Sequence, residues 1–286
     1  MWSRFEQMRM NTPSLYFGTS SWTAAGWEAA FYPPKSKQAD YLPFYAGRFN
    51  SVEIDSTFYR VPSAKTVQQW RERTPEGFVF AAKIPQSITH EKCLVGADAD
   101  LKEFVGVMDL LGPKLGPLLI QMPYFNKQKF DGLDSFLRVL EPFLRSLPPN
   151  HQWALEIRNK NWLGEKFFSI LRSYGVAYTL IDQSWMPRPG ELFQRGDPIT
   201  AGFTYVRWLG DRKGIEERTK VWDKTIIDRT ADLREWVRFL KPVWSRGVVI
   251  YVYANNRYAG FAPETVRLFN QLWVEGKLDS LGTYRA

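Results

Sequence analysis

Charged and polar side chains stand at or just beyond the ends of short apolar segments along this 286-residue chain. Carboxylates, amines and guanidinium groups gathered at one place can transfer protons and bind polar or anionic ligands. The residues of this kind are Glu53, Asp55, Lys83, Gln121, Glu156, Arg158, Asp182, Arg207, Asn255 and Asn256. Because buried charges are costly unless they are paired or meet a ligand, the pattern predicts a functional site.

Eight segments rich in β-branched and aromatic residues are predicted to be strands. They cover residues 15–19, 51–55, 78–83, 118–121, 153–157, 176–180, 203–207 and 248–253. Amphipathic segments between them carry helix start and stop signals, and Ser63 is expected to cap one of them. The predicted helices follow Ser63 and cover residues 36–49, 98–111, 131–147, 161–174, 225–246 and 263–275.

Strands that alternate with helices predict an α/β protein with a parallel sheet. Eight such units in one chain favour a single (β/α)8 TIM-type barrel over an open doubly wound sheet. No G-x-G-x-x-G follows the first strand, which argues against a dinucleotide-binding fold. Residues 181–200 show little helical periodicity, so the sixth helical segment is expected to be irregular.

Alternation along the strands predicts where the polar side chains point. Glu53 and Asp55 share one face of the second strand, while Val52 and Ile54 share the other. Lys83, Gln121, Glu156 and Arg158 likewise oppose apolar sets in their strands, and Asp182, Arg207, Asn255 and Asn256 close or follow the last three. All are therefore predicted to line the barrel mouth at the C-terminal strand ends, where TIM barrels carry their active sites.

These residues also give the chain a family resemblance. It resembles the YecE-like family, or domain of unknown function 72, from Leu15 to about Leu272. The matching stretches are GTSSW (18–22), VEIDSTFY (52–59), Lys83 with Thr89 and His90, GPLLIQMP (116–123), ExR (156–158), YVR (205–207) and YANN (253–256). The resemblance implies a TIM-type barrel and supplies no activity. The chain departs from many members at Ser21, where they have glycine, and at Leu209, where they have histidine.

Composition limits the class of protein. The formal net charge of +8 favours anionic ligands, and the single cysteine, Cys93, excludes an internal disulfide. Two histidines leave little basis for a zinc site built on several imidazoles. Residues 1–13 are expected to be a flexible extension without signal-peptide character, preceding one barrel domain over 14–286. The chain lacks a run of about 20 apolar residues, so we expect a cytoplasmic protein without a membrane partner.

The first functional hypothesis is an enzyme of hydrolase or isomerase type that uses acid–base chemistry on a small polar or anionic ligand containing a sugar or phosphate. Its expected catalytic residues are Glu53, Lys83, Glu156 and Asp182. Its expected ligand-binding residues are Trp22, Asp55, Phe58, Tyr59, His90, Gln121, Arg158, Arg207, Asn255 and Asn256. No cofactor is predicted. A divalent metal on Glu53, Glu156, Asp182 and His90 is the weaker variant, because Lys83 and two arginines would repel a cation.

The alternative is a barrel that binds or processes nucleic acid. A basic flank and base-stacking aromatics beyond the strand ends support it. These aromatics are Trp22, Trp27, Phe58, Tyr59, Tyr124, Trp162, Trp185 and Trp208, whereas Trp70, Trp236, Trp244 and Trp273 are expected in the helical core. The sequence predicts no oligomeric state.

Overall fold

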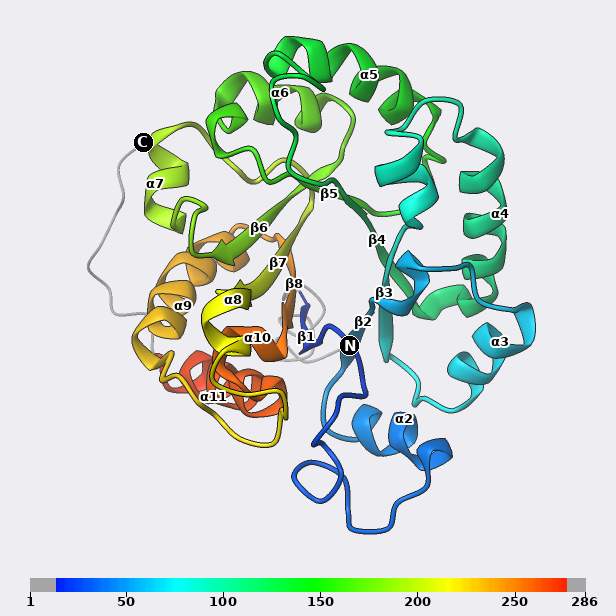
Figure 1. The fold of residues 1–286 in the computed structure, drawn as a ribbon, viewed down its shortest axis with the longest axis vertical. Coiled ribbons are helices and arrows are strands. Elements are labelled where there is room, and N and C mark those ends of the chain that lie inside the picture. The colour runs from blue at the N-terminus through cyan, green and yellow to red at the C-terminus, as the bar shows by residue number, and fades with distance from the viewer. Residues whose placement is uncertain (1–13, 277–286) are drawn as a thin grey trace, which may run out of the picture.

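Eight parallel strands form the wall of a (β/α)8 TIM-type barrel in the computed structural model, which describes residues 14–276 (Figure 1). The fold predicted from the sequence is therefore confirmed. The strands are β1 Leu15–Thr19, β2 Ser51–Ile54, β3 Val79–Lys83, β4 Leu115–Gln121, β5 Trp153–Glu156, β6 Ala177–Gln183, β7 Phe203–Gly210 and β8 Val249–Ala254. Their hydrogen-bonded order is β1-β8-β7-β6-β5-β4-β3-β2. The extension expected at residues 1–13 lies outside the described residues.

Helices surround the strands (Figure 1). The α-helices are α2 Gln38–Ala46, α3 Ala64–Glu72, α4 Asp98–Met108, α5 Leu133–Ser146, α6 Glu165–Ser173, α7 Pro189–Gln194, α8 Arg212–Glu216, α9 Thr230–Ser245, α10 Asn256–Ala259 and α11 Ala262–Glu275. Short turns of other helical types are η1 Ser56–Phe58, η2 Ser87–Glu91, η3 Asp109–Lys114 and η4 Lys160–Trp162. Between residues 14 and 276, no helix is both long and apolar enough to cross a membrane.

Local signals predicted most elements correctly, with differences at their ends. Ser63 caps α3, because its Oγ accepts a hydrogen bond from the Thr66 backbone N–H at 3.2 Å. The sixth helical segment, which was expected to be irregular, contains only the short helix α7 of six residues. The helix predicted from residue 225 begins only at Thr230. β6 and β7 continue beyond their predicted ends to Gln183 and Gly210, and the short helices α8 and α10 were not predicted.

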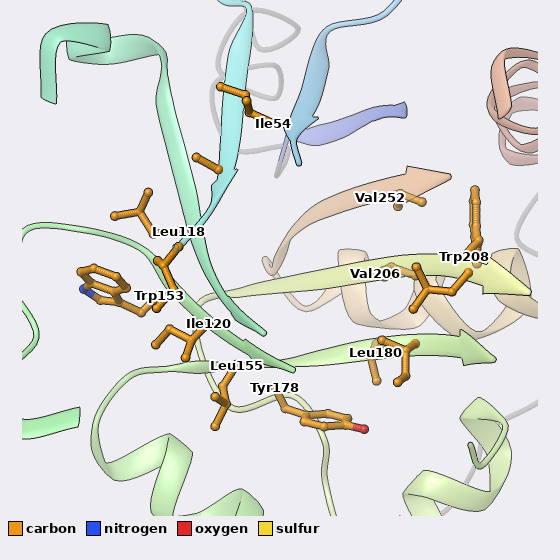
Figure 2. Close-up of a cluster of buried hydrophobic side chains, with 14 of the residues drawn as sticks. Ile54, Leu118, Ile120, Trp153, Leu155, Tyr178, Leu180, Val206, Trp208 and Val252 are labelled. Carbon is orange, nitrogen blue, oxygen red and sulfur yellow. The ribbon is translucent and has the colours of Figure 1, made fainter. Parts of the chain in front are cut away.

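The two faces of the strands have different neighbours. Outward-facing side chains such as Leu118, Ile120, Leu155 and Val206 belong to the main apolar core together with the helices (Figure 2). Inward-facing side chains fill the barrel interior with a second apolar cluster, formed by Val79, Ala81, Leu119, Ala154, Ala177, Phe203, Tyr205, Tyr251 and Tyr253. The same inward positions become charged toward the C-terminal strand ends, so the core supports the predicted mouth from below.

Side chains connect β1 to β2, which are not hydrogen-bonded as neighbouring strands in the described sheet. The amide group of Asn50 accepts a hydrogen bond from the Phe17 N–H at 2.9 Å and donates one to the Leu15 carbonyl at 2.8 Å. The hydroxyl of Tyr45, on α2, accepts from the Thr19 N–H at 2.8 Å and donates to the Ser51 carbonyl at 3.2 Å. These contacts take the place of a backbone ladder and close the barrel wall.

We call this junction between β1 and β2 the seam, and we expect Gly18→Ala to destabilise the protein there. A Cβ at position 18 would lie 1.9 Å from the Ser51 carbonyl oxygen and 2.7 Å from the Tyr45 hydroxyl, so backbone would have to move. Overpacking of this kind costs about 1–3 kcal/mol. Urea denaturation measures the loss. Gly106→Ala in α4 is the control, because a Cβ there meets no atom within 4 Å and should be neutral or stabilising. Equal stability of the two variants would contradict the prediction.

Candidate functional site

Arg207, in the C-terminal half of β7, joins two carboxylates across the barrel interior. Its Nη2 lies 2.7 Å from Oε1 of Glu53 on β2, and its Nη1 lies 2.7 Å from Oε2 of Glu156 on β5. The two glutamates are fully buried, and the arginine is 3% exposed. One guanidinium therefore holds strands from opposite parts of the wall at a fixed distance.

Two further donors complete this ion-pair group. Arg158 donates from Nε at 2.9 Å and from Nη2 at 2.7 Å to Oε1 of Glu156. The hydroxyl of Tyr205 donates to Oε2 of Glu53 at 2.6 Å. Each of the four carboxylate oxygens thus accepts a hydrogen bond from an inward-pointing side chain. We call Glu53, Glu156, Arg158, Tyr205 and Arg207 the buried charge cluster.

Electrostatics keep Glu156 and Arg207 ionised. Burial alone would raise the pKa of Glu156, but the charges of Arg207 and Arg158 outweigh it and lower the pKa to about 2. Burial alone would lower the pKa of Arg207, yet Glu53 and Glu156 raise it well above its ordinary value. At neutral pH Glu156 and Arg207 therefore carry fixed, opposite charges.

Lys83 stands beside the cluster, at the end of β3. Its side chain is 9% exposed, its Nζ lies 3.3 Å from Oδ1 of Asp55, and it lies 3.8 Å from the centroid of the Phe58 ring. Burial lowers the pKa of the Lys83 amine, although Asp55 partly opposes this shift. The Lys83 amine therefore loses its proton more readily than that of an exposed lysine.

His90 lies next to this lysine. The His90 ring meets the Phe58 ring edge to face at 4.9 Å, and its Nδ1 lies 2.8 Å from the Thr89 hydroxyl. Burial, followed by the charges of Lys83 and Arg158, lowers the pKa of His90 below its ordinary 6.5. The imidazole is accordingly mostly neutral at pH 7. Tyr59 packs edge-on against Phe58 and is 69% exposed, at the outer rim.

The remaining predicted mouth residues differ in their contacts. Gln121 is buried beside Glu156 in the register of β4 and β5, and its Nε2 donates to the Met122 carbonyl at 2.7 Å. Asn255 follows β8 and caps α10, because its Oδ1 accepts from the Arg257 N–H at 3.0 Å. Trp22 follows β1 and packs edge-on against Trp70 at 5.5 Å.

The predicted position of Asp182 in the mouth is wrong. Its Oδ2 accepts hydrogen bonds from Trp236 Nε1 at 2.7 Å, from the Tyr258 hydroxyl at 3.0 Å and from Arg188 Nη1 at 3.1 Å. Trp236 and Tyr258 belong to α9 and α10, so this carboxylate faces the helices. Because β6 extends to Gln183, Asp182 has the same outward parity as Leu180. Without Asp182, three acids and three bases of the predicted set remain at the mouth.

Asn256 is also turned away from the mouth. Its Oδ1 accepts from Trp27 Nε1 at 3.3 Å and from the Ala262 backbone N–H at 2.9 Å, so it fixes the start of α11. Trp27 is 1% exposed and Trp208 is fully buried. The expectation that these two tryptophans stack on a nucleic-acid base is therefore wrong. The expected core position of Trp236 is confirmed.

Three polar residues near the mouth were not predicted. Tyr205 shares the inward parity of Arg207, and this parity would have revealed it. Ser20 continues the inward set of Tyr16 and Gly18, and its buried Oγ has no hydrogen-bond partner among the described residues. Gln183 is buried at the end of β6, and its Oε1 is likewise unpartnered within residues 14–276. Unpartnered buried groups at a site entrance suit contact with a ligand or water.

The alternative metal site does not form from the four residues considered for it. Glu53 and Glu156 direct their oxygens to arginines and Tyr205, while Asp182 faces the helices. In the described part of the chain, no group of three histidine, cysteine or acidic side chains is arranged to hold a metal ion.

Removing Arg207 should be severely destabilising. In Arg207→Met, Glu53 and Glu156 would remain buried without their shared cation, and breaking a buried ion pair costs about 3–5 kcal/mol. Chemical denaturation at neutral pH measures this loss. Arg212→Met is the control, because the Arg212 side chain is 70% exposed and its pair with Glu216 should contribute at most about 1 kcal/mol. Similar losses in both variants would refute a structural role of the cluster.

The pH dependence of stability should report Glu156. Its pKa in the folded state, about 2, is below the ordinary value of 4.5, so its ionised form stabilises the fold fully above pH 4.5. This contribution is lost as the pH falls from 4.5 toward 2. The difference in free energy of unfolding between wild type and Glu156→Gln should therefore narrow over this range. A difference that stays constant below pH 4.5 would contradict the assignment.

Comparisons with known proteins show the family and the fold of this chain. Residues 16–282 match the family described as "Protein of unknown function DUF72". UPF0759 protein YunF of Bacillus subtilis is 28% identical over 272 residues, covering 87% of this chain and 91% of YunF. UPF0759 protein YecE of Escherichia coli K12 is 30% identical over 174 residues, covering 59% of each chain. A DUF72 family protein from Thermotoga maritima has a TM-score of 0.73 at 24% identity, covering 92% of this chain and 100% of its own. The chain belongs to the DUF72 family.

Proposed function

We propose that the C-terminal mouth of the barrel is the active site of an enzyme that transfers protons on a small polar or anionic ligand containing a sugar or phosphate. The observation that carries the proposal is the position of Lys83. Its amine is buried between Asp55 and the Phe58 ring, next to a set of fixed charges. Burial in such surroundings lowers the pKa of a lysine, so that its amine can give up and take back a proton more readily than an exposed one.

The buried charge cluster supports Lys83, rather than the two glutamates, as the group that moves a proton. Glycoside hydrolysis needs one carboxylic acid that is protonated before the reaction. Glu156 stays ionised because its pKa is about 2, and both oxygens of Glu53 already accept hydrogen bonds. This arrangement favours proton transfer of the isomerase type over hydrolysis by a carboxylate pair.

Arg158 is the group best placed to bind an anion. Two of its nitrogen atoms are held by Glu156, while Nη1 makes no hydrogen bond to any described residue. A guanidinium fixed by a buried carboxylate keeps its free N–H groups in place, which lowers the cost of ordering them when a ligand binds. His90, being mostly neutral, could offer a hydrogen bond there without another charge.

The alternative proposal, a barrel that binds nucleic acid, has weaker support. Tyr59, Tyr124 and Trp185 remain exposed and could stack on bases, but the cluster at the mouth is balanced in charge. Such binding would depend steeply on salt, because each phosphate contact releases counterions.

A ligand panel read by thermal shift tests the enzyme proposal. We expect one sugar, sugar phosphate or phosphorylated compound to raise the melting temperature. At 100 times its Kd, binding would add about 2.7 kcal/mol to the free energy of unfolding. Turnover of that compound should increase with pH through a midpoint below 10.5, the ordinary lysine value. Lys83→Met should lower kcat at least 100-fold, the usual scale of general acid–base catalysis.

Lys102→Met is the matched control, since Lys102 lies exposed on α4 and should not alter turnover. Thermal melts of both variants without ligand show that they are folded. Turnover that persists in Lys83→Met would refute the role of Lys83 as the proton-transfer group.

A further inference from the structure

A cavity of about 440 Å³ opens beside the mouth, between the loops that follow β4, β5 and β6. Its volume is in the range of about 300–1,000 Å³ that is usual for small-molecule sites. Arg158 lines this cavity and also belongs to the buried charge cluster, so the two are continuous. The side chains that matter here are Tyr124, Lys127, Arg158, Lys160, Trp162 and Trp185.

The inner wall of the cavity is rigid. Asn159 accepts from the Phe125 N–H at 3.0 Å and donates to the Phe125 carbonyl at 2.8 Å, which ties the β5 loop to the β4 loop. Trp162 stacks on Phe136 with ring centroids 5.0 Å apart and lies over Phe125 at 6.2 Å. The cavity is therefore formed before a ligand arrives, and little ordering is needed on binding.

Two aromatic rings at the rim are unusually exposed. Tyr124 is 67% exposed and Trp185 is 45% exposed, and neither contacts another aromatic ring within residues 14–276. They come from the β4 and β6 loops, on either side of the β5 loop. Large flat rings exposed beside a preformed cavity offer stacking surfaces for a planar ligand.

The basic side chains of the cavity favour a ligand that carries an anionic group as well as a planar ring. Lys127, Arg158 and Lys160 line the cavity, against one acid, Asp131. In the described chain Lys127 and Lys160 make no ion pair, and Nη1 of Arg158 is without a partner. Guanidinium and ammonium groups with free N–H donors suit the oxygen atoms of a phosphate.

We propose that this cavity binds a nucleotide, with its planar base stacked on Tyr124 and Trp185 and its phosphate on Arg158, Lys127 and Lys160. The inference extends the proposed function, because it names the class of ligand that would reach Lys83. The same base-and-phosphate chemistry occurs in a free mononucleotide and in a single-stranded end, so the experiment must distinguish these sources.

Isothermal titration calorimetry on the full chain tests the inference. Adenosine 5′-monophosphate should bind, while adenosine and ribose 5-phosphate, each lacking one half of the recognised chemistry, should bind at least tenfold more weakly. Trp185→Ala and Tyr124→Ala should each weaken binding of the nucleotide about 5- to 150-fold and leave ribose 5-phosphate unaffected. Lys127→Ala should weaken both phosphorylated compounds.

The matched controls are Phe193→Ala and Lys129→Ala. Phe193 is a similarly exposed ring on α7, 40% exposed, and Lys129 is an exposed lysine in the same loop as Lys127. Neither residue lines the cavity. Both variants should bind the nucleotide as the wild type does, and a loss of binding in them equal to that in Trp185→Ala or Lys127→Ala would overturn the proposal.

Other outcomes separate the inference from the proposed function. Wild-type protein that binds no nucleotide at millimolar concentration would overturn the inference alone, since the effect of Lys83→Met on turnover is measured independently. Ribose 5-phosphate bound as tightly as the nucleotide would overturn the stacking part. If a short oligonucleotide binds far more tightly than the mononucleotide, with steep salt dependence, the inference is supported and the natural ligand is a nucleic-acid strand. If the two bind equally tightly, the inference is supported and the natural ligand is a free nucleotide.

Discussion

The Arg207 guanidinium, shared by Glu53 and Glu156, is the interaction on which the mouth of this barrel depends. It lies where the apolar filling of the barrel ends, and every oxygen of the two carboxylates accepts a hydrogen bond from Arg207, Arg158 or Tyr205. An isolated charge at this depth would be very costly, but charges whose carboxylate oxygens are all paired are tolerated, even though Nε of Arg207 has no hydrogen-bond partner among the described residues. Because these charges are paired, they can be buried inside the barrel directly below the mouth. A ligand in the mouth would then meet charges held in place instead of mobile water.

Lys83 acquires its distinct character from being left out of this pairing. The arginines and Tyr205 already satisfy both buried glutamates, so the lysine has only Asp55, which is partly exposed, and the face of Phe58. Its ammonium form is poorly compensated, and this is why burial dominates the shift of its pKa. The distribution of charges across β2, β3, β5 and β7 thus has two effects: it pairs the carboxylates of the buried charge cluster, and it leaves the Lys83 amine without a buried carboxylate partner.

Alternation along strands is a local rule, and it predicted the inward positions of Glu53, Lys83, Glu156 and Arg207. Asp182 was misplaced because the predicted strand ended too early: β6 has three additional residues, and alternation along them puts Asp182 on the outward face with Leu180. Contacts between distant segments could not be read from the sequence at all. The contact of Asn256 with Trp27 and the cavity between three loops both depend on how the closed barrel places its connections.

The seam between β1 and β2 gives the barrel wall an unequal susceptibility to mutation. Elsewhere in the described wall, neighbouring strands are joined by backbone hydrogen bonds, which no substitution other than proline can remove. At the seam, the side chains of Asn50 and Tyr45 make the connections, so a single substitution at either residue can remove hydrogen bonds between β1 and β2. Because Ser20 and Glu53 lie at the mouth on either side of it, relatives could adjust the width of the site here by single substitutions while the rest of the wall stays unchanged.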